Sequence, residues 1–284
     1  MASKRRKGAK GRQDETQGGR INRLRSPAAG ASVHSLLEGY AHILRRARAA
    51  PKVVLFLDFD GTLTPLRSLG NQARLAPETR DLLDRLSHCP RLAVFILSGR
   101  RLSDLASRVR VPKVRCLGVH GWEGRSGVRL DSTSRLAVRR ARAAARRDLL
   151  QFSGIRLEDK RVAFAIHYRG APPVSVRQAR RRLLSLLRPF HHELRLMDGK
   201  RIWEVLPQAN RGKGEAAQQL LRRYPPRSLP IYIGDDTTDE AAFCALPRAV
   251  TVRVGGFRGT HARWRARNPT EVLYFLKLLE TDPC

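Results

Sequence analysis

Short apolar runs alternate with amphipathic stretches from Pro51 onward, and this alternation is the main structural signal of the sequence. The continuous Val/Leu/Phe run at Val53–Phe59 predicts a strand buried on both faces. Leucines at helical spacing in Pro77–Ser87, after a proline suited to a first turn, predict a helix. The pattern continues with a strand at Leu92–Leu97, a helix from near Arg101 and a strand at Val114–Val119. Alternating strands and helices predict a parallel sheet that helices cover on both faces.

The same alternation resumes late in the chain. Its predicted helices are Gly212–Arg223, Thr238–Ala245 and Glu271–Leu279, and its predicted strands are Ile231–Ile233 and Ala249–Val254. These elements are of the same kinds as the earlier ones. The two blocks are therefore expected to build one sheet together.

The order of predicted helices and strands changes between about residues 126 and 206. Helices and strands are predicted in the order helix, strand, helix, strand, strand at about Thr133–Phe152, Val162–Tyr168, Pro172–Leu187, Glu193–Met197 and Arg201–Val205. The last two strands flank Asp198-Gly199-Lys200, in which Asp-Gly is typical of a tight hairpin turn. The fold class is therefore predicted to be α/β: a Rossmann-like parallel-sheet core at 29–125 and 207–284, with a small α/β cap domain inserted at 126–206.

The composition is that of a folded protein with a large positive charge. In 284 residues, 56 Lys and Arg stand against 25 Asp and Glu, which gives a formal net charge of +31, and 42% of the residues are hydrophobic. Enough apolar surface is present to exclude global disorder, except in residues 1–28, which are predicted to be a flexible basic tail. No apolar run approaches the roughly 18 to 20 residues of a membrane-spanning helix, so no membrane contact is expected. The basic start lacks the apolar core of a secretory signal, and we expect a cytoplasmic protein.

The positive charge by itself does not identify a partner. Such a charge attracts any polyanion, including phosphorylated small molecules and nucleic acid. Only 6% of the residues are aromatic, and no RNA-binding module is recognisable, so nucleic acid is not expected beyond a weak contact of the basic tail. The sequence leaves the oligomeric state open.

The cysteines indicate neither a disulfide framework nor a zinc site. Cys89, Cys116, Cys244 and Cys284 stand far apart and lack metal-ligand spacing. We therefore expect four reduced thiols.

Two carboxylates, Asp58 and Asp60, stand two residues apart where the first buried apolar run ends. Ligands of open α/β sheets bind at this carboxyl edge, and two neighbouring acids normally need a cation or a shared proton. An EF-hand calcium loop does not fit, because Thr62 and Leu63 stand where it needs an acidic or amide residue and a glycine. A turn with solvated acids remains an alternative for this pair alone.

A second acidic cluster, Gly234–Glu240, follows another short apolar strand and opens a helix. The ends of neighbouring parallel strands converge on one crevice, and carboxylates from both clusters form an oxygen-ligand set suited to Mg²⁺. Asp235 is the main candidate ligand. Asp236 fits equally well as a helix-start residue, and Asp239 as a residue that supports a ligand from behind.

Two further segments supply groups suited to phosphate. Ser98, Gly99 and Arg100 end the strand at Leu92–Leu97, where a hydroxyl and a backbone N–H at a helix start receive phosphate oxygens. Lys213, between Gly212 and Gly214, precedes a helix and can neutralise phosphate charge. A Walker-type phosphate loop fits poorly there, because glycine follows the lysine in place of Ser or Thr. Each segment alone is a weak signal, but together with both acidic clusters they form a strong one.

In this order, the motifs resemble those of the haloacid-dehalogenase-like phosphatase superfamily, and finer details resemble trehalose-6-phosphate phosphatases. The superfamily motifs are Asp58-Phe-Asp60-Gly-Thr, Ser98, Lys213 and Gly234-Asp235-Asp236-Thr-Thr-Asp239. The finer details are Leu97–Arg100, Gly118–Gly121, Leu157–Lys160, Ile166–Arg169, Gly199-Lys200 and Glu204. The resemblance extends from about residue 35 to the C-terminus.

The resemblance implies a Mg²⁺-dependent phosphatase that hydrolyses trehalose 6-phosphate through an aspartyl-phosphate. Asp58 is then the nucleophile and Asp60 the general acid and base. Ser98 and Lys213 hold the phosphate oxygens. The metal is held by Asp58, the Asp60 carbonyl and Asp235. The substrate-binding residues that it implies are Gly99, Arg100, His120, Lys160, His167, Lys200 and Glu204.

Other functions remain open at this point. A sibling enzyme for sucrose phosphate or a mannosylglycerate-type phosphate would share the core chemistry and differ in the cap. A protein of another class would bind RNA or another polyanion on a catalytically silent core. Lys160 and Lys200 also fit as exposed turn charges, and His167 fits as a half-buried strand residue.

Overall fold

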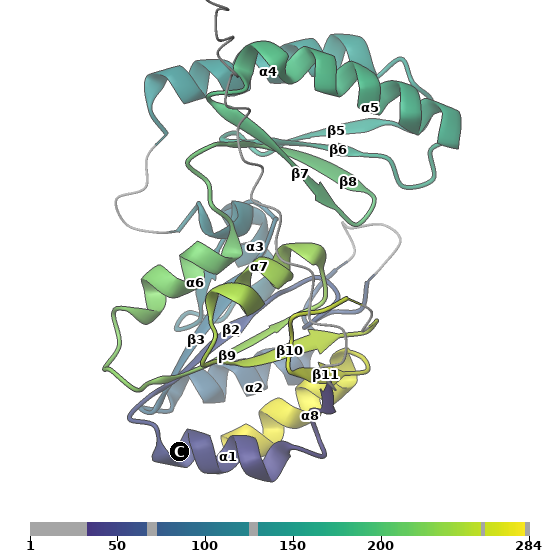
Figure 1. Ribbon diagram of the computed structural model, residues 1–284. Helices are drawn as coiled ribbons and strands as arrows, with labels where there is room; N and C mark the ends of the chain where they lie inside the picture. Colours follow the sequence, from purple (N-terminus) through teal and green to yellow (C-terminus); the bar gives the residue numbers. More distant parts are fainter. Residues whose placement is uncertain (1–32, 67–72, 125–129, 257–258, 282–284) are drawn as a thin grey trace, which may run out of the picture.

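The computed structural model describes residues 33–66, 73–124, 130–256 and 259–281 (Figure 1). Within these ranges the chain forms two sheets, one parallel with seven strands and one antiparallel with four. This confirms the predicted α/β fold class, with a large parallel-sheet unit and a smaller α/β unit. The predicted basic tail at 1–28 lies outside the described residues.

The large sheet has the strand order β1-β11-β10-β9-β2-β3-β4, and every neighbouring pair is parallel. Its strands are β1 (His34–Ser35), β2 (Val53–Leu57), β3 (Leu92–Leu97), β4 (Arg115–Leu117), β9 (Leu229–Gly234), β10 (Val250–Val254) and β11 (Trp264–Ala266). From β2 the chain builds outward to β3 and β4, and it later returns to add β9 on the other side of β2. The strand order therefore reverses between β2 and β9, where open sheets of this kind form a crevice.

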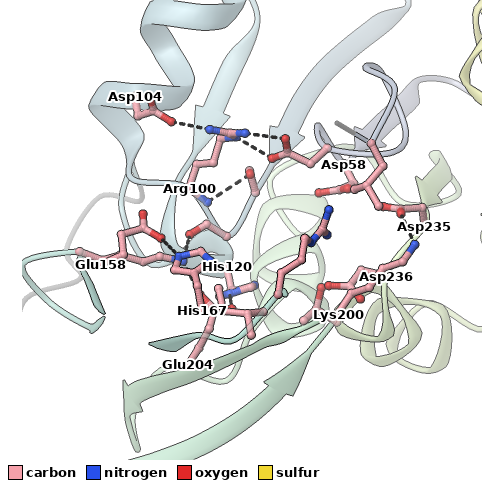
Figure 2. Close-up of a pocket in the computed structure, with 18 of the residues that line it drawn as sticks. Asp58, Arg100, Asp104, His120, Glu158, His167, Lys200, Glu204, Asp235 and Asp236 are labelled. Carbon is pink, nitrogen blue, oxygen red and sulfur yellow. Dashed lines mark hydrogen bonds and ion pairs between the residues drawn. The ribbon is translucent and has the colours of Figure 1, made fainter. Parts of the chain in front are cut away.

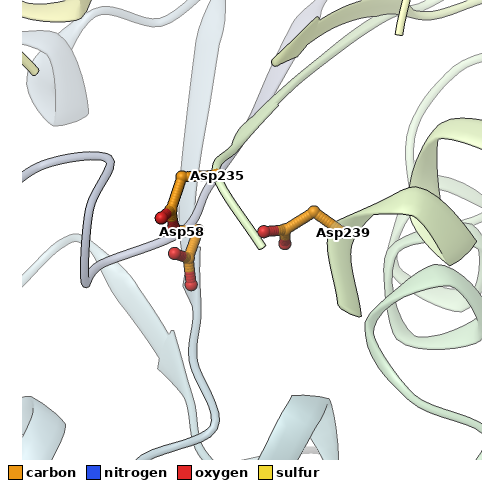
Figure 3. Close-up of side chains that lie close together, drawn as sticks. All are labelled: Asp58, Asp235 and Asp239. Carbon is orange, nitrogen blue, oxygen red and sulfur yellow. The ribbon is translucent and has the colours of Figure 1, made fainter. Parts of the chain in front are cut away.

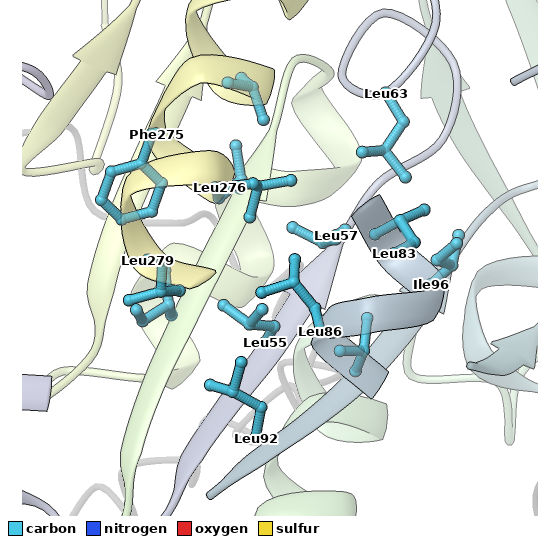
Figure 4. Close-up of a cluster of buried hydrophobic side chains, with 14 of the residues drawn as sticks. Leu55, Leu57, Leu63, Leu83, Leu86, Leu92, Ile96, Phe275, Leu276 and Leu279 are labelled. Atoms are coloured by element: carbon cyan, nitrogen blue, oxygen red, sulfur yellow. The ribbon is translucent and has the colours of Figure 1, made fainter. Parts of the chain in front are cut away.

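Helices cover both faces of the large sheet. On one face, Leu55 and Leu57 of β2 belong to a core cluster with residues of α1 (Tyr40–Ala49), α2 (Pro77–His88), α3 (Leu102–Val109) and α8 (Pro269–Glu280) (Figure 4). On the other face, Val54 and Phe56 pack with residues of α6 (Lys213–Leu221) and α7 (Thr237–Ala245). Alternate residues of β2 thus enter opposite cores, which explains its unbroken apolar run.

The small sheet has the order β5-β6-β8-β7 and is entirely antiparallel. Its elements are α4 (Ser132–Leu149), β5 (Arg156–Asp159), β6 (Phe164–His167), α5 (Pro173–Leu187), the short 3-10 turn η3 (Arg188–Phe190), β7 (Leu194–Gly199) and β8 (Ile202–Pro207). Both α4 and α5 lie on the face turned away from the large sheet (Figure 1). The opposite face of the small sheet is therefore turned toward the core.

The chain crosses between the two sheets twice, and the crossings are tied together. The first follows the 3-10 turn η2 (Val119–Gly121), and the second follows β8. Asn210, which is buried on the second crossing, donates from Nδ2 to the Val119 carbonyl at 3.0 Å. Val119 has φ of 47°, a costly conformation for a β-branched residue, so tertiary contacts must hold this turn in place.

Most predicted elements are present, and the structure differs from the prediction in four additional elements, one turn and one cysteine. β1, α1, β5 and β11 were not predicted. The Asp-Gly turn was placed too early, since Asp198 and Gly199 still pair with β8 and the turn consists of Lys200 and Arg201, the latter with φ of 66°. The expectation of reduced thiols is wrong at Cys89, which is disulfide-bonded, whereas Cys116 and Cys244 are free. Sequence spacing does not reveal which distant cysteines a fold brings together.

Leu83→Ala tests the core beneath β2. Leu83 on α2 is fully buried, so its truncation leaves a cavity and is expected to lower the free energy of unfolding by about 2–5 kcal/mol. Urea unfolding measures this loss. The control is Leu184→Ala on α5, where a leucine that is 49% exposed is expected to contribute less than about 0.5 kcal/mol. Equal losses in the two variants would contradict the assigned core.

Candidate active site

The first and second acidic clusters meet where β2 and β9 end. Leu57 pairs with Ile233 in the parallel register, and Asp58 N–H donates to the Ile233 carbonyl at 2.9 Å. Asp58 and Asp235 therefore leave neighbouring strands at the same sheet edge. This edge is the crevice at which the strand order reverses.

Three buried carboxylates come together at this edge. Carboxylate oxygens of Asp58, Asp235 and Asp239 lie within 4.8 Å of one another (Figure 3). The exposed fraction of these residues is 8% or less. Gly61 makes room for the cluster, because its φ is +86° and a Cβ there would come within 2.2 Å of an Asp235 oxygen.

Lys213 neutralises part of this negative charge. Its ammonium donates to Asp58 Oδ1 at 2.6 Å and to Asp239 Oδ1 at 2.8 Å, and it is 3% exposed. Tyr232 on β9 donates from its hydroxyl to the same Asp239 oxygen at 2.9 Å. Asp239 is thus a support for the lysine as well as a member of the acidic cluster.

The acidic cluster is poised for a cation. Burial, together with the neighbouring carboxylates of Asp239 and Asp235, outweighs the opposite effect of Lys213 and raises the pKa of Asp58 well above its usual range. Burial also raises the pKa of Asp235 to about 6, with Asp239 and Asp236 adding to the effect. Asp235 Oδ1 is buried and has no hydrogen-bond partner among the described residues. Oxygen ligands, an unpaired buried oxygen and uncompensated charge fit a hard divalent cation such as Mg²⁺.

Asp236 has a local structural role. It caps α7, since its Oδ1 accepts from Thr237 N–H at 2.8 Å while its own N–H donates to Asp239 Oδ2 at 3.0 Å. The helix-start alternative for Asp236 is therefore observed, although this residue also lines the pocket described next.

A polar pocket of about 590 Å³ lies between the large and small sheets (Figure 2). Every site residue expected from the sequence lines it except Asp239, which is fully buried beneath it. Residues that sequence reasoning did not select also line it, among them Asp104, Arg156, Glu158 and Arg169. The pocket thus joins the acidic edge of the core to the inner face of the small sheet.

Strand alternation explains which side chains of the small sheet reach the pocket. In β8, Trp203 and Val205 enter the core under the helices, so Ile202 and Glu204 face the pocket. Arg156 and Glu158 of β5 also line the pocket, together with Leu157 between them. The two charged residues were missed because β5 is short and three of its four residues are charged, so it has no alternating pattern that would mark it as a strand.

Four predicted substrate-binding residues contact one another across the two units. Lys160 Nζ donates to Glu204 Oε1 and, at 2.7 Å, to the Gly99 carbonyl. His120 Nε2 lies 2.5 Å from Glu204 Oε2. Lys160, Glu204 and His120 are each at most 4% exposed. The result is a buried ionic bridge between the small sheet and the loop after β3.

This bridge is strongly coupled. Burial favours the neutral form of Glu204, but His120 and Lys160 outweigh that effect and hold the pKa of this carboxyl far below its usual range. Burial also favours the neutral form of Lys160, which lowers its pKa. The carboxylates of Glu204 and Glu158 outweigh this effect, so the pKa of Lys160 is raised. Each charge in the bridge depends on the others.

The remaining predicted residues lie nearer the opening. His167 Nε2 lies 2.8 Å from Glu158 Oε2, and both side chains are about one third exposed or more. Lys200 reaches to 4.0 Å from Asp235 Oδ2. Ser98 is buried at the end of β3, and its Oγ accepts from Arg100 N–H at 3.2 Å.

Comparison with solved structures defines the fold class. The C. albicans trehalose-6-phosphate phosphatase C-terminal domain superposes with a TM-score of 0.74 at 23% identity, covering 89% of this chain and 99% of that one. The Aspergillus fumigatus trehalose-6-phosphate phosphatase gives 0.65 at 27% identity, covering 88% and 99%. The fold is that of haloacid-dehalogenase-like phosphatases.

Sequence comparison identifies the family. The trehalose-phosphatase family matches residues 56–268. A trehalose-phosphate phosphatase of Mycobacterium tuberculosis is 32% identical over 249 residues, which cover 80% of this chain and 61% of the relative. A probable trehalose-phosphate phosphatase of Oryza sativa is 28% identical over 280 residues, covering 86% and 72%. The chain belongs to the trehalose-phosphatase family, although it spans about three fifths of the mycobacterial relative.

No helix in the described ranges is long and apolar enough to cross a membrane.

Glu204→Gln tests the ionic bridge. The change leaves Lys160 buried without a negative partner, so we expect stability to fall by about 3–5 kcal/mol. Glu280→Gln is the matched control, because its pair with Arg85 lies at the surface away from the bridge and contributes at most about 1 kcal/mol. Thermal and urea unfolding compare the two. In the double variant Lys160→Met/Glu204→Gln the unpaired ammonium is gone, and part of the stability should return; a further loss would contradict the bridge.

The raised pKa of Asp235 predicts a pH dependence of the metal-free protein. Its folded-state pKa of about 6 exceeds the ordinary 3.8, so the folded state binds a proton more tightly than the unfolded state. Ionisation therefore destabilises the fold progressively as pH rises from about 4 to about 6. Relative to Asp235→Asn, which stays neutral, the melting temperature of the wild type should fall across this window. A constant difference between the two proteins would show that Asp235 has an ordinary pKa.

Proposed function

We propose that this protein is a Mg²⁺-dependent phosphatase that hydrolyses trehalose 6-phosphate to trehalose and phosphate. The observation that carries the proposal is the convergence of Asp58, Lys213 and Asp235 at the floor of a polar pocket large enough for a sugar phosphate. The names of the mycobacterial and fungal relatives support the choice of substrate. An RNA-binding function has no comparable support.

In the first step, an Asp58 carboxylate oxygen attacks phosphorus. The bond between phosphorus and the sugar oxygen breaks, and Asp60 gives its proton to the departing oxygen. Lys213 is placed to hold a non-bridging phosphate oxygen, because its ammonium already lies 2.6 Å from Asp58. Ser98, at the neighbouring strand end, supplies a hydroxyl to the same group. The products of this step are free trehalose and an aspartyl-phosphate.

In the second step, water attacks phosphorus of the aspartyl-phosphate. Asp60, now ionised, removes a proton from that water, and the bond between phosphorus and the Asp58 oxygen breaks. Phosphate leaves, Asp58 is a carboxylate again and Asp60 is again protonated. The atoms balance as the hydrolysis of one phosphate ester.

Asp58, Asp235 and the Asp60 backbone carbonyl would hold the metal. When bound, Mg²⁺ supplies positive charge that reduces repulsion between the nucleophile and the phosphate dianion. The raised pKa of Asp58 in the metal-free protein shows why this matters, because the nucleophile must be ionised to react. Asp239 then keeps Lys213 in position from beneath the site.

We further propose that residues 126–206 act as a cap that selects the sugar. Selection of a sugar requires fixed polar partners that a wrong ligand leaves unpaired. Lys160, His167, Lys200 and Glu204 are the proposed cap contributors, with Gly99, Arg100 and His120 on the core side. Phosphates of sucrose or mannosylglycerate type are the alternative substrates, which need the same core and a different set of cap contacts.

Phosphate release from a panel of sugar phosphates, with and without Mg²⁺, tests this function. Trehalose 6-phosphate should be the preferred substrate, and removal of Mg²⁺ with a chelator should abolish turnover. Asp58→Asn removes the nucleophile and should lower turnover by at least about 10³-fold. Asp84→Asn, which changes a half-exposed carboxylate on α2 outside the pocket, is the matched control and should not alter turnover. Full activity in Asp58→Asn would contradict the mechanism, and a preference for another sugar phosphate would contradict the substrate.

A further inference from the structure

Arg100 holds Asp60 through a two-pronged ion pair. Its Nε donates to Asp60 Oδ2 at 2.6 Å, and its Nη2 donates to Asp60 Oδ1 at 2.6 Å. Both oxygens of the ionised carboxylate are thus engaged by one planar guanidinium, and when Asp60 carries its proton one of these two bonds is given up while the other remains. This fork geometry fixes the rotation of the carboxylate as well as its position.

Arg100 is itself fixed from the side away from Asp60. Its Nη1 donates to Asp104 Oδ2 at 2.9 Å (Figure 2). Asp104 Oδ1 accepts in turn from Arg108 Nε at 2.9 Å. Arg108 is tied to the Ala73 carbonyl at 2.6 Å, and the Arg100 guanidinium carbon lies 5.6 Å from the centre of the Phe59 ring. The Arg100 side chain is only 15% exposed. A chain of ion pairs thereby connects Asp60 to the first turns of α3.

The charges agree with this geometry. Burial lowers the pKa of Arg100, but its hydrogen bonds and ion pairs with Asp60 and Asp104 outweigh burial and raise that pKa. All three guanidinium nitrogens contact a carboxylate oxygen. The protein's own acids therefore engage every guanidinium nitrogen, which gives Arg100 a task in holding Asp60 besides the substrate contact proposed above.

We propose that Arg100 is a positioning residue that aims the Asp60 carboxyl at the oxygen leaving the phosphate. This inference rests on the proposed function, in which Asp60 transfers the proton. Asp60 lies on a turn beyond β2, and its side chain is 32% exposed, so packing alone does not fix its rotamer. Misplacement of a reacting group by about 1 Å costs roughly 10²-fold in rate.

This role predicts a dependence on the leaving group. A sugar alkoxide is a poor leaving group and needs the proton from Asp60, whereas p-nitrophenolate departs as a stable anion without one. If the Asp60 carboxyl loses its fixed orientation, phosphoryl transfer from a sugar phosphate should therefore slow. Transfer from p-nitrophenyl phosphate should change little. Loss of a phosphate contact would slow both.

The experiment measures the single-turnover rate of phosphoryl transfer to the enzyme from trehalose 6-phosphate and from p-nitrophenyl phosphate. In Arg100→Lys, which keeps the charge and loses the fork, the rate with trehalose 6-phosphate should fall by about 10²-fold while the other rate changes little. Asp104→Asn, which loosens the support of Arg100, should give a smaller effect with the same selectivity. Arg85→Lys, which alters an exposed two-pronged pair with Glu280, is the matched control and should change neither rate.

A double-variant comparison isolates the pathway through Asp60. In an Asp60→Asn background the proton donor is already absent, so adding Arg100→Lys should cost little more with trehalose 6-phosphate. Equal losses for the two substrates, additive losses in the double variant, or a raised KM with unchanged kcat would each overturn the positioning role. A wild-type protein that cleaves p-nitrophenyl phosphate but no sugar phosphate would instead contradict the proposed function itself.

Discussion

Buried negative charge at the end of two parallel strands is the constraint on which this structure depends. Asp58, Asp235 and Asp239 stand within 4.8 Å of one another, and Lys213 is the cation that contacts two of them. One buried ammonium does not balance three carboxylates in a site shielded from water, and burial together with the neighbouring carboxylates raises the pKa values of Asp58 and Asp235. A divalent cation would satisfy both the charge and the unpaired oxygen of Asp235.

Buried charges also shape the small sheet. Its helix-covered face is apolar, while its inner face carries charges that pair with one another and with groups of the core. Glu204 receives hydrogen bonds from Lys160 of its own unit and from His120 on the crossing between units. Because the bridge is buried, the position of the small sheet over the pocket is tied to the complete set of partners. The acidic edge of the large sheet and the bridge of the small sheet line the same pocket.

The sequence was sufficient where a signal is local. The apolar run of β2 and the acids that follow it can be recognised without a structure, because a strand buried on both faces and a pair of neighbouring carboxylates are local patterns. Other elements lack such a signal. α1 is rich in arginine and buries only a narrow stripe, and β1 and β11 are two and three residues long. Their stability comes from the neighbours they pair with, which the sequence does not reveal.

Which side chains of the site contact one another was the hardest feature to predict from the sequence. The residues of the ionic bridge were expected from a resemblance to contact sugar, but their contacts with one another depend on the register of β6 against β8 and on the η2 turn. Arg100 was likewise expected at the substrate, and its pairing with Asp60 spans 40 residues. Tyr232 was read as an ordinary strand residue, although its hydroxyl supports Asp239.

Metal titration shows directly whether Asp58 and Asp235 share one divalent cation. Mn²⁺, used as a spectroscopic substitute for Mg²⁺, can be titrated at pH 7.5 and followed by electron paramagnetic resonance in the wild type, Asp58→Asn, Asp235→Asn and the control Asp84→Asn. We expect one ion per chain in the wild type and the control, and loss of most of the affinity in each of the other two variants. Undiminished binding in Asp235→Asn would mean that the two carboxylates do not share an ion.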